Sequence, residues 1–176
     1  MKLHLGCGKK HIPGFIHVDL EDHPHVNFRI PVNRLDFAQD NTVDLIYASH
    51  VLEHFGRHEI DQVLGEWFRV LRSGGILRLA VPDFAAVARR YQETGELPEL
   101  VGLVSGGQRN EYDFHKMVFD EKLLRERLMK AGFTSVRRYD WRQTEHSWLD
   151  DYSQAYLPHL DKEKGQLMSL NLEAVK

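Results

Sequence analysis

Two glycines and one acid stand where they could bind an adenosine-containing ligand. Gly6 and Gly8 follow a short segment with alternating apolar residues, and Asp19 ends the next apolar segment. Glycines directly after a strand let a ligand approach the backbone closely, and an acid that ends the following strand can accept hydrogen bonds from two ribose hydroxyls. A Gly-x-Gly pair alone is more typical of a plain turn, so the prediction depends on the combination.

Histidines spaced four residues apart form a second candidate site. The chain contains 11 His, and residues 50–54, HVLEH, match the HxxEH pattern of inverted zinc peptidases, which His58 extends by one turn. Two His at this spacing on a helix can chelate zinc, with Glu53 as a base. The motif begins where an apolar strand ends, however, and Gly56 interrupts the helix. We therefore expect no metal at these histidines, with His54 orienting the loop and His58 at the surface.

A Tyr-x-x-x-Lys pair occurs at Tyr112 and Lys116. In short-chain dehydrogenases a lysine placed one helical turn from the tyrosine lowers the pKa of that tyrosine and so assists hydride transfer. Here the pair follows Gly106-Gly107 in an irregular segment, and the glycine motif at residues 6–8 lacks the third glycine that a dinucleotide favours. Chance explains the pair better than an NAD-dependent oxidoreductase does.

Four side chains are candidate general bases. His115 and Asp113 lie in the same irregular segment, and the ordinary pKa of a histidine is close to working pH. Asp83 and His50 each follow an apolar strand. Each of the four could equally be an ordinary loop or capping residue.

Alternating strand and helix patterns predict the elements that position these residues. We expect strands within residues 2–8, 15–20, 43–50, 76–81, 133–141 and 168–175, and helices at 59–72, 83–94 and 120–131. Strands that alternate with helices predict a parallel sheet built by right-handed crossovers.

A ligand of such a sheet binds beyond the carboxyl ends of the strands. The residues that the pattern brings to this edge are Gly6, Cys7, Gly8, Asp19, Ser49, His50 and Asp83. We expect one domain over residues 1–176, in which the long segments 95–118 and 142–166 serve as substrate-binding or lid segments. Trp148, Tyr152 and Tyr156 of the second segment could stack on a sugar or a ring of the acceptor.

Composition excludes several classes of function. The 176 residues carry 23 Lys and Arg against 26 Asp and Glu, a formal charge of −3, without the basic tract that nucleic-acid binding needs. No apolar run has the length of a signal peptide core or of a membrane span. A single cysteine, Cys7, forms no internal disulfide. We expect a cytoplasmic protein that binds neither nucleic acid nor membrane.

Four motifs together resemble the class I S-adenosylmethionine-dependent methyltransferases, in particular the small type 11 group. They are LHLGCG at 3–8, HVDL at 17–20, DNTVDLIYASHVLEHF at 40–55 and EWFRVLRSGGILRLAVPDF at 66–84, and SLNLEAVK at 169–176 is similar to the final strand of that fold.

The resemblance implies a Rossmann-like α/β fold with an antiparallel last strand and S-adenosylmethionine as cofactor. It implies cofactor contacts at Gly6, Cys7, Gly8, Asp19, Leu20, Ser49 and His50, and adenine recognition by Asn33 or Asp36, between which the sequence does not decide.

The sequence departs from the family pattern in three respects. His4 replaces the usual acid, and Lys10 replaces the usual third glycine. Only residues 9–15 join the first two strands, and Pro13-Gly14 interrupts them, so the first helix is reduced to a turn. The chain also begins in its first strand, without the family's N-terminal lid helix. The two long segments, or a second subunit in a homodimer, then have to cover the pocket.

The function that follows is methyl transfer to an oxygen or nitrogen of a small-molecule or glycan-like acceptor. The sulfonium already activates the methyl group, so the protein has to align the acceptor and take its proton. The alternative is a catalytically degenerate, methyltransferase-like binding subunit, in which His4 and Lys10 have disabled the cofactor pocket.

Overall fold

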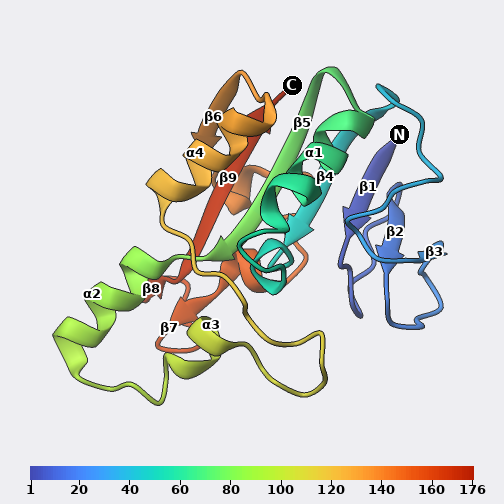
Figure 1. The fold of residues 1–176 in the computed structure, drawn as a ribbon. Coiled ribbons are helices and arrows are strands. Elements are labelled where there is room, and N and C mark those ends of the chain that lie inside the picture. The colour runs from blue at the N-terminus through green and yellow to red at the C-terminus, as the bar shows by residue number, and fades with distance from the viewer.

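The computed structural model describes residues 1–176. Seven strands form one sheet: β1 (Lys2–Leu5), β2 (Ile16–Asp19), β3 (Phe28–Arg29), β4 (Val43–Ser49), β5 (Leu71–Pro82), β6 (Ser135–Arg138) and β9 (Ser169–Val175). Their order is β3-β2-β1-β4-β5-β9-β6 (Figure 1). Strands β1 to β5 pair in parallel, and β9 runs antiparallel to both β5 and β6. The predicted mostly parallel sheet with an antiparallel last strand is confirmed.

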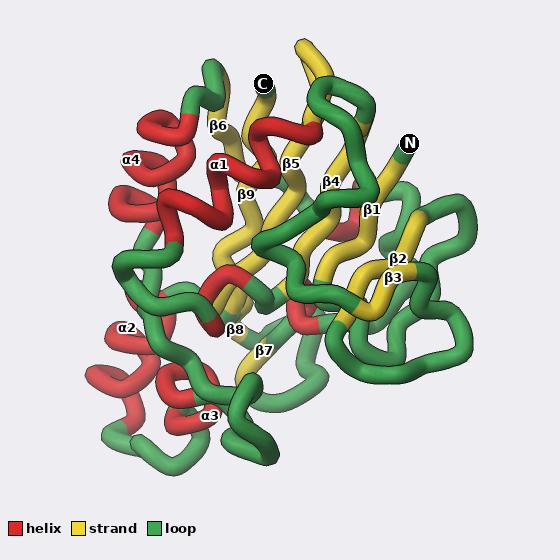
Figure 2. The backbone as a smooth tube through the Cα atoms, turned by 45° about the vertical axis from the view of Figure 1, so that its right-hand side comes forward, coloured by secondary structure: helices red, strands yellow, loops and turns green.

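Two helices, α1 (Ile60–Val70) and α4 (Glu121–Ala131), cover one face of the sheet (Figure 2). An apolar stripe on α1 that includes Trp67 packs with the inward side chains of α4 and the central strands in the main core. The indole Nε1 of Trp67 donates to the carbonyl of Val32 at 2.9 Å, which fixes the segment before β4 against this helix. Asp120 caps α4 by accepting from Leu123 N at 2.7 Å.

The opposite face of the sheet is covered by segment 142–166 instead of by helices. This segment was expected to lack regular structure, but it contains short elements: η3 (Tyr152–Gln154) and a hairpin of β7 (Tyr156–Leu157) and β8 (Gln166–Leu167), preceded by η2 (Trp141–Gln143). Its predicted role as a substrate-binding or lid segment stays a prediction. Leu149 packs into a second core cluster with Tyr47. The Tyr47 hydroxyl donates to Asp151 Oδ2 at 2.5 Å. Most of the segment therefore forms the wall of this face.

The connection between β1 and β2 contains no helix. Ile12 and Phe15 turn inward from it and join the second core cluster, and the backbone of Ile12 donates to His17 Nε2 at 2.9 Å. The predicted reduction of the first helix to a turn is confirmed. Lys10, at the position of the family's third glycine, is exposed and donates its ammonium to the carbonyl of Asp150.

The structure differs from the predicted elements at one strand boundary, one short helix and one short strand. The predicted strand at 76–81 starts earlier, because β5 begins at Leu71 and pairs with Val43 before a shift in register. Residues 73–75, which were expected only to end the helix, form the bulge that takes up this shift. Segment 95–118 was expected to be irregular but contains α3 (Val101–Ser105), and the short β3 was not predicted.

Helix α2 (Phe84–Thr94) follows β5 and lies with α3 beyond the carboxyl end of that strand (Figure 1). Neither of them, nor α1 or α4, combines the length with the apolar character that crossing a bilayer requires.

Candidate active site

The turn after β1 places backbone groups at the carboxyl edge of the sheet. Gly6 donates its N–H to Val18 O at 2.8 Å and adopts a φ of +61°, in the left-handed region that favours glycine. A Cβ on Gly6 would lie 2.4 Å from Val51 Cγ2, so the turn sits directly against the segment that follows β4. A Cβ on Gly8 would meet no atom within 4 Å. The turn is thus packed at Gly6 and open at Gly8.

The carboxylate of Asp19 holds this turn from the end of β2. Its Oδ2 accepts from Gly8 N at 2.7 Å, and its Oδ1 accepts from Glu21 N at 2.8 Å. Each carboxylate oxygen has a further lone pair, so Asp19 can still accept hydroxyl donors from a ligand. The half-buried acid and the open backbone at Gly8 form a cradle that suits a ribose and the chain attached to it.

The remaining predicted cofactor residues differ in their accessibility. Cys7 is buried with its Sγ 3.8 Å from His25 Nε2, and burial followed by the charge of Asp19 raises the pKa of its thiol to about 12. It is therefore a neutral thiol. Leu20 is exposed, Asn33 is half-buried, and Asp36 is exposed and paired with Arg34 at 2.7 Å. The choice between Asn33 and Asp36 for adenine remains a prediction.

His50, directly after β4, contacts residues of β9 and of η3. His50 adopts a φ of +55°, and its Nε2 lies 3.1 Å from Ser169 Oγ, which in turn donates to Asn171 Oδ1. The imidazole also packs 5.3 Å from the exposed ring of Tyr152, measured between centroids. Burial lowers the pKa of His50 to about 3, so this imidazole is neutral. Ser49 Oγ is buried without a hydrogen-bond partner.

Glu53 is the most unusual group at this edge. It is fully buried on the short helix η1 (Leu52–His54), and neither carboxyl oxygen makes a hydrogen bond of normal geometry. His50 Nδ1 lies 3.3 Å from Glu53 Oε1, and His115 Nε2 lies 3.9 Å from the same oxygen. Burial raises the pKa of Glu53 to about 8, because no cation compensates a carboxylate there.

His115, from the segment between α3 and α4, completes a cluster with Glu53 and His54, which we call the Glu53 cluster. The rings of His54 and His115 lie 4.9 Å apart. The backbone N–H groups of Lys116 and Met117 both donate to Glu53 O, at 2.8 and 3.2 Å, so the segment is fastened onto η1. In the sequence Glu53 stands out only as part of a zinc motif, and the HxxEH pattern is the signal that marks it.

The two alternative motifs do not have the geometry that their chemistry needs. His50 precedes the three-residue η1, so His50 and His54 do not share the face of an α-helix, and His58 is exposed. Residues 112–116 contain no helix, and Tyr112 is 60% exposed. Tyr112 and Lys116 therefore do not stand one helical turn apart as they do in a dehydrogenase.

Two of the predicted bases make structural contacts. Asp83 is the N-cap of α2, where its Oδ1 accepts from Ala85 N at 3.0 Å and from Ala86 N at 3.4 Å. Asp113 accepts from Arg109 Nε at 2.7 Å, and this hydrogen bond lowers the pKa of Asp113. Their catalytic roles remain predictions, as does that of His115.

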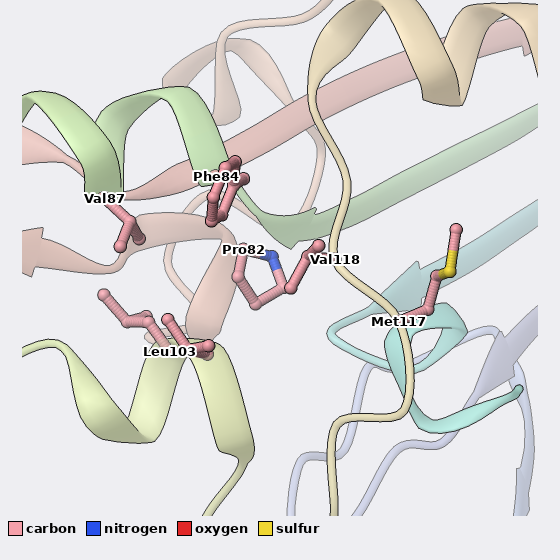
Figure 3. Close-up of a pocket in the computed structure, with 7 residues that line it drawn as sticks. Pro82, Phe84, Val87, Leu103, Met117 and Val118 are labelled. Atoms are coloured by element: carbon pink, nitrogen blue, oxygen red, sulfur yellow. The ribbon is translucent and has the colours of Figure 1, made fainter. Parts of the chain in front are cut away.

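A small apolar hollow lies beside the cluster, beyond the end of β5. Figure 3 shows its lining side chains, which come from the start of α2, from α3 and from the segment after His115. Its volume is about 10 Å³, and it is lined by Pro82, Phe84, Val87, Leu103, Val104, Met117 and Val118. The exposed rings of Phe84, Tyr112, Phe114 and Tyr152 belong to the same carboxyl-end segments. The edge thus combines buried polar groups with accessible apolar ones.

Comparison with known proteins agrees with this arrangement. Residues 13–79, less than half of the chain, match the family described as methyltransferase domain, type 11. The chain has the fold of the class I S-adenosylmethionine-dependent methyltransferases. The resemblance predicted from the four motifs is confirmed, and the match supports S-adenosylmethionine as the cofactor of this methyltransferase fold. No curated protein sequence matches the chain.

Solved methyltransferases superpose on nearly the whole chain at low sequence identity. The 1,6-didemethyltoxoflavin-N1-methyltransferase of Burkholderia thailandensis, solved with its substrate and S-adenosylhomocysteine, is 19% identical, with a TM-score of 0.59 over 99% of this chain and 70% of its own. A methyltransferase of Archaeoglobus fulgidus is 15% identical, with a TM-score of 0.59 over 99% and 85%. A possible histamine N-methyltransferase of Thermotoga maritima is 14% identical, with a TM-score of 0.60 over 99% and 81%.

Proposed function

We propose that the chain transfers the methyl group of S-adenosylmethionine to an oxygen or nitrogen of a small-molecule or glycan-like acceptor. The observation that carries this proposal is the position of the Glu53 cluster beside the glycine turn. The close approach of Gly6 to Val51, two residues before Glu53, joins the cofactor cradle to the cluster. The methyl donor and a set of proton acceptors thus lie at neighbouring strand ends.

The cradle residues bind and orient the cofactor. Gly8 leaves room beside the backbone, Asp19 accepts the ribose hydroxyls, and Ser49 and His50 lie at the end of the neighbouring strand. When bound, S-adenosylmethionine supplies an electrophilic methyl group on sulfur. Its amino acid end needs a partner other than His4, because His4 is buried and burial lowers the pKa of that imidazole to about 3.

The acceptor side has to remove one proton. As the S–CH3 bond breaks, an O–CH3 or N–CH3 bond forms, S-adenosylhomocysteine leaves, and the proton of the acceptor passes to a base. The Nδ1 of His115 lies 3.0 Å from the carbonyl of Leu103, to which it donates. Its Nε2 therefore keeps a lone pair that can accept the proton, and we assign His115 as the base.

Features of the same edge of the sheet support this chemical class of acceptor. A hydroxyl or an amine needs a base to lose its proton, whereas a thiolate or a carboxylate does not. The exposed aromatic rings of Tyr112, Phe114, Trp148 and Tyr152 can stack on a sugar or an aromatic ring. The methyltransferase of B. thailandensis is named as an N1-methyltransferase of 1,6-didemethyltoxoflavin, which is consistent with nitrogen as the acceptor atom.

Calorimetry tests the cofactor half of the proposal. S-adenosylmethionine and S-adenosylhomocysteine should each bind saturably at one site, while NAD should not. Release of S-adenosylhomocysteine in the presence of monosaccharides, disaccharides and aromatic amines then tests the acceptor half. Tight NAD binding without heat from S-adenosylmethionine would support the oxidoreductase instead. No saturable binding of any of them would support the degenerate subunit.

A further inference from the structure

The Glu53 cluster has the composition of a metal site. Glu53, His54 and His115 each offer one ligand atom, and these three atoms lie within 4.8 Å of one another. This set differs from the sequence motif, in which His50 and His54 would chelate the metal. The expectation of no metal concerned the motif histidines His50, His54 and His58. It did not consider His115, which the fold places beside Glu53.

The imidazoles of His54 and His115 are both held in the tautomer that carries its hydrogen on Nδ1, so that Nε2 is free to bind a metal. His54 Nδ1 lies 3.1 Å from the carbonyl of Phe114, and His115 Nδ1 lies 3.0 Å from the carbonyl of Leu103. A carbonyl can only accept, so each Nδ1 carries the hydrogen and each Nε2 keeps its lone pair. Metal-binding histidines commonly have their second nitrogen fixed by a backbone carbonyl in this way.

The carboxyl group of Glu53 lacks the partner that its burial demands. Both oxygens are buried without a hydrogen bond, and the basic groups within 4 Å of them are the imidazoles of His50 and His115. Lys116 reaches Glu53 through its backbone N–H alone. A buried carboxylate without a compensating charge is strongly unfavourable, and charged groups in protein interiors are paired or bind metals.

We propose that Glu53, His54 and His115 together bind one divalent transition-metal ion. Two imidazoles and one carboxylate suit Zn²⁺ and Mn²⁺, among other first-row ions. Three protein ligands leave at least one coordination position open. His50, which lies 3.3 Å from Glu53 Oε1, is a positioning residue for the carboxylate.

The role of the ion rests on the proposed function, although its binding does not. An acceptor hydroxyl that fills the open position loses its proton more easily, because the cation stabilises the resulting oxyanion. The acceptor oxygen would then be held beside the cofactor cradle. In the metal-bound enzyme the Nε2 of His115 binds the ion, and the proton of the acceptor leaves through water.

Metal binding is measured on the full chain, without cofactor or acceptor. After removal of bound metal with a chelator and dialysis, Zn²⁺, Mn²⁺ and Mg²⁺ are titrated separately by calorimetry. We expect one site for Zn²⁺ or Mn²⁺, with affinity weakened at least 100-fold in Glu53→Gln, His54→Gln and His115→Asn. The matched control is His58→Gln, which removes an exposed histidine near the cluster and should change nothing.

Two further measurements keep the test decisive. Far-UV circular dichroism and thermal melting show whether each variant is folded. Where one variant does not fold, the absorption spectrum of Co²⁺ bound to the wild type reports the coordination number of the ion, and loss of this spectrum in the remaining folded variants assigns the ligands. The proposal is overturned if the wild type binds none of these ions below millimolar concentration, or if the cluster variants bind Zn²⁺ and Mn²⁺ as well as His58→Gln does.

The outcomes separate this proposal from the proposed function. A chain that binds S-adenosylmethionine but no metal rejects the metal site and leaves methyl transfer standing. A chain that binds Zn²⁺ or Mn²⁺ but no S-adenosylmethionine does the reverse.

Discussion

The backbone N–H of Gly8 donates to Asp19 Oδ2 at 2.7 Å and so ties the turn after β1 to the end of β2. One carboxylate therefore shapes the turn and faces the open side of the cofactor cradle. The same acid has a structural role in this turn and, in the proposed function, a binding role toward the ribose.

Asp19→Ala should weaken the binding of S-adenosylmethionine by about 1–3 kcal/mol, because hydrogen bonds from the ribose to a charged acceptor are lost. Asp19→Asn should be weakened less, since an amide oxygen still accepts. Calorimetry measures both, and Asp22→Ala is the control because the Asp22 carboxylate is largely exposed. Unchanged affinity in Asp19→Ala would remove this residue from the site.

Gly6→Ala should lower the free energy of unfolding by about 2–4 kcal/mol, from left-handed backbone strain together with the clash with Val51. Gly14→Ala is the control for strain alone, because its φ is +82° and a Cβ there meets no atom within 4 Å. Denaturant unfolding measures each. The double variant Gly6→Ala/Val51→Ala should recover part of the loss, and no recovery would show that the contact with Val51 does not matter.

His115→Asn should lower turnover by roughly 10²–10⁴ once an acceptor is found, because either a proton acceptor or a metal ligand is lost. Its affinity for S-adenosylmethionine should change little, since His115 lies on the acceptor side. Turnover is followed by release of S-adenosylhomocysteine, with His58→Asn as the control. Full activity in His115→Asn would show that His115 is not the base, and His50 or Asp83 would become the better candidate.

Asp83→Ala should destabilise the protein by about 1 kcal/mol, because α2 loses its N-cap, whereas Asp83→Asn should keep most of that stability. Thermal and denaturant unfolding give both values. Turnover of the stable Asp83→Asn variant then shows whether the carboxylate is also a base. Equal stability in the alanine variant would contradict the capping role.

Acid should destabilise the fold through histidines buried on the second face of the sheet. Burial lowers the pKa of His4 to about 3 and that of His146 to about 4. Between these values and the ordinary 6.5 the unfolded chain binds more protons than the native one, so stability is full above about pH 6.5 and falls as the pH drops. The groups that act on these two are His11, His17, His25, Lys2, Arg78, Glu145 and Asp151.

Urea unfolding between pH 4 and 8 measures this dependence. His4→Leu should reduce the slope, because one titrating imidazole is removed from the unfolded chain without adding a charge to the native one. His159→Leu is the control, because that residue is exposed. The same slope in His4→Leu and in the wild type would assign the acid sensitivity to other groups.

The sequence alone was sufficient for the order of the main elements and for the edge of the sheet at which the strand ends meet. Apolar periodicity and caps such as Asp120 and Gly132 are local signals, so α4 and the strands around it could be predicted from neighbouring residues. Parallel strands place their carboxyl ends together, and this rule brought Gly6, Asp19 and His50 to one edge before any contact was known.

Only the tertiary structure showed that His115 lies beside Glu53. Glu53 lies on η1, and His115 lies in the segment before α4. Two backbone hydrogen bonds, from the N–H groups of Lys116 and Met117 to Glu53 O, hold that segment against η1. In this position the carboxyl group of Glu53 is buried without a hydrogen bond. The fold also decided that residues 142–166 cover the second face, because the first helix of the fold is missing there and the apolar surface of Tyr47 and Leu45 has to be buried. Long-range packing of this kind leaves no periodic signal in the sequence.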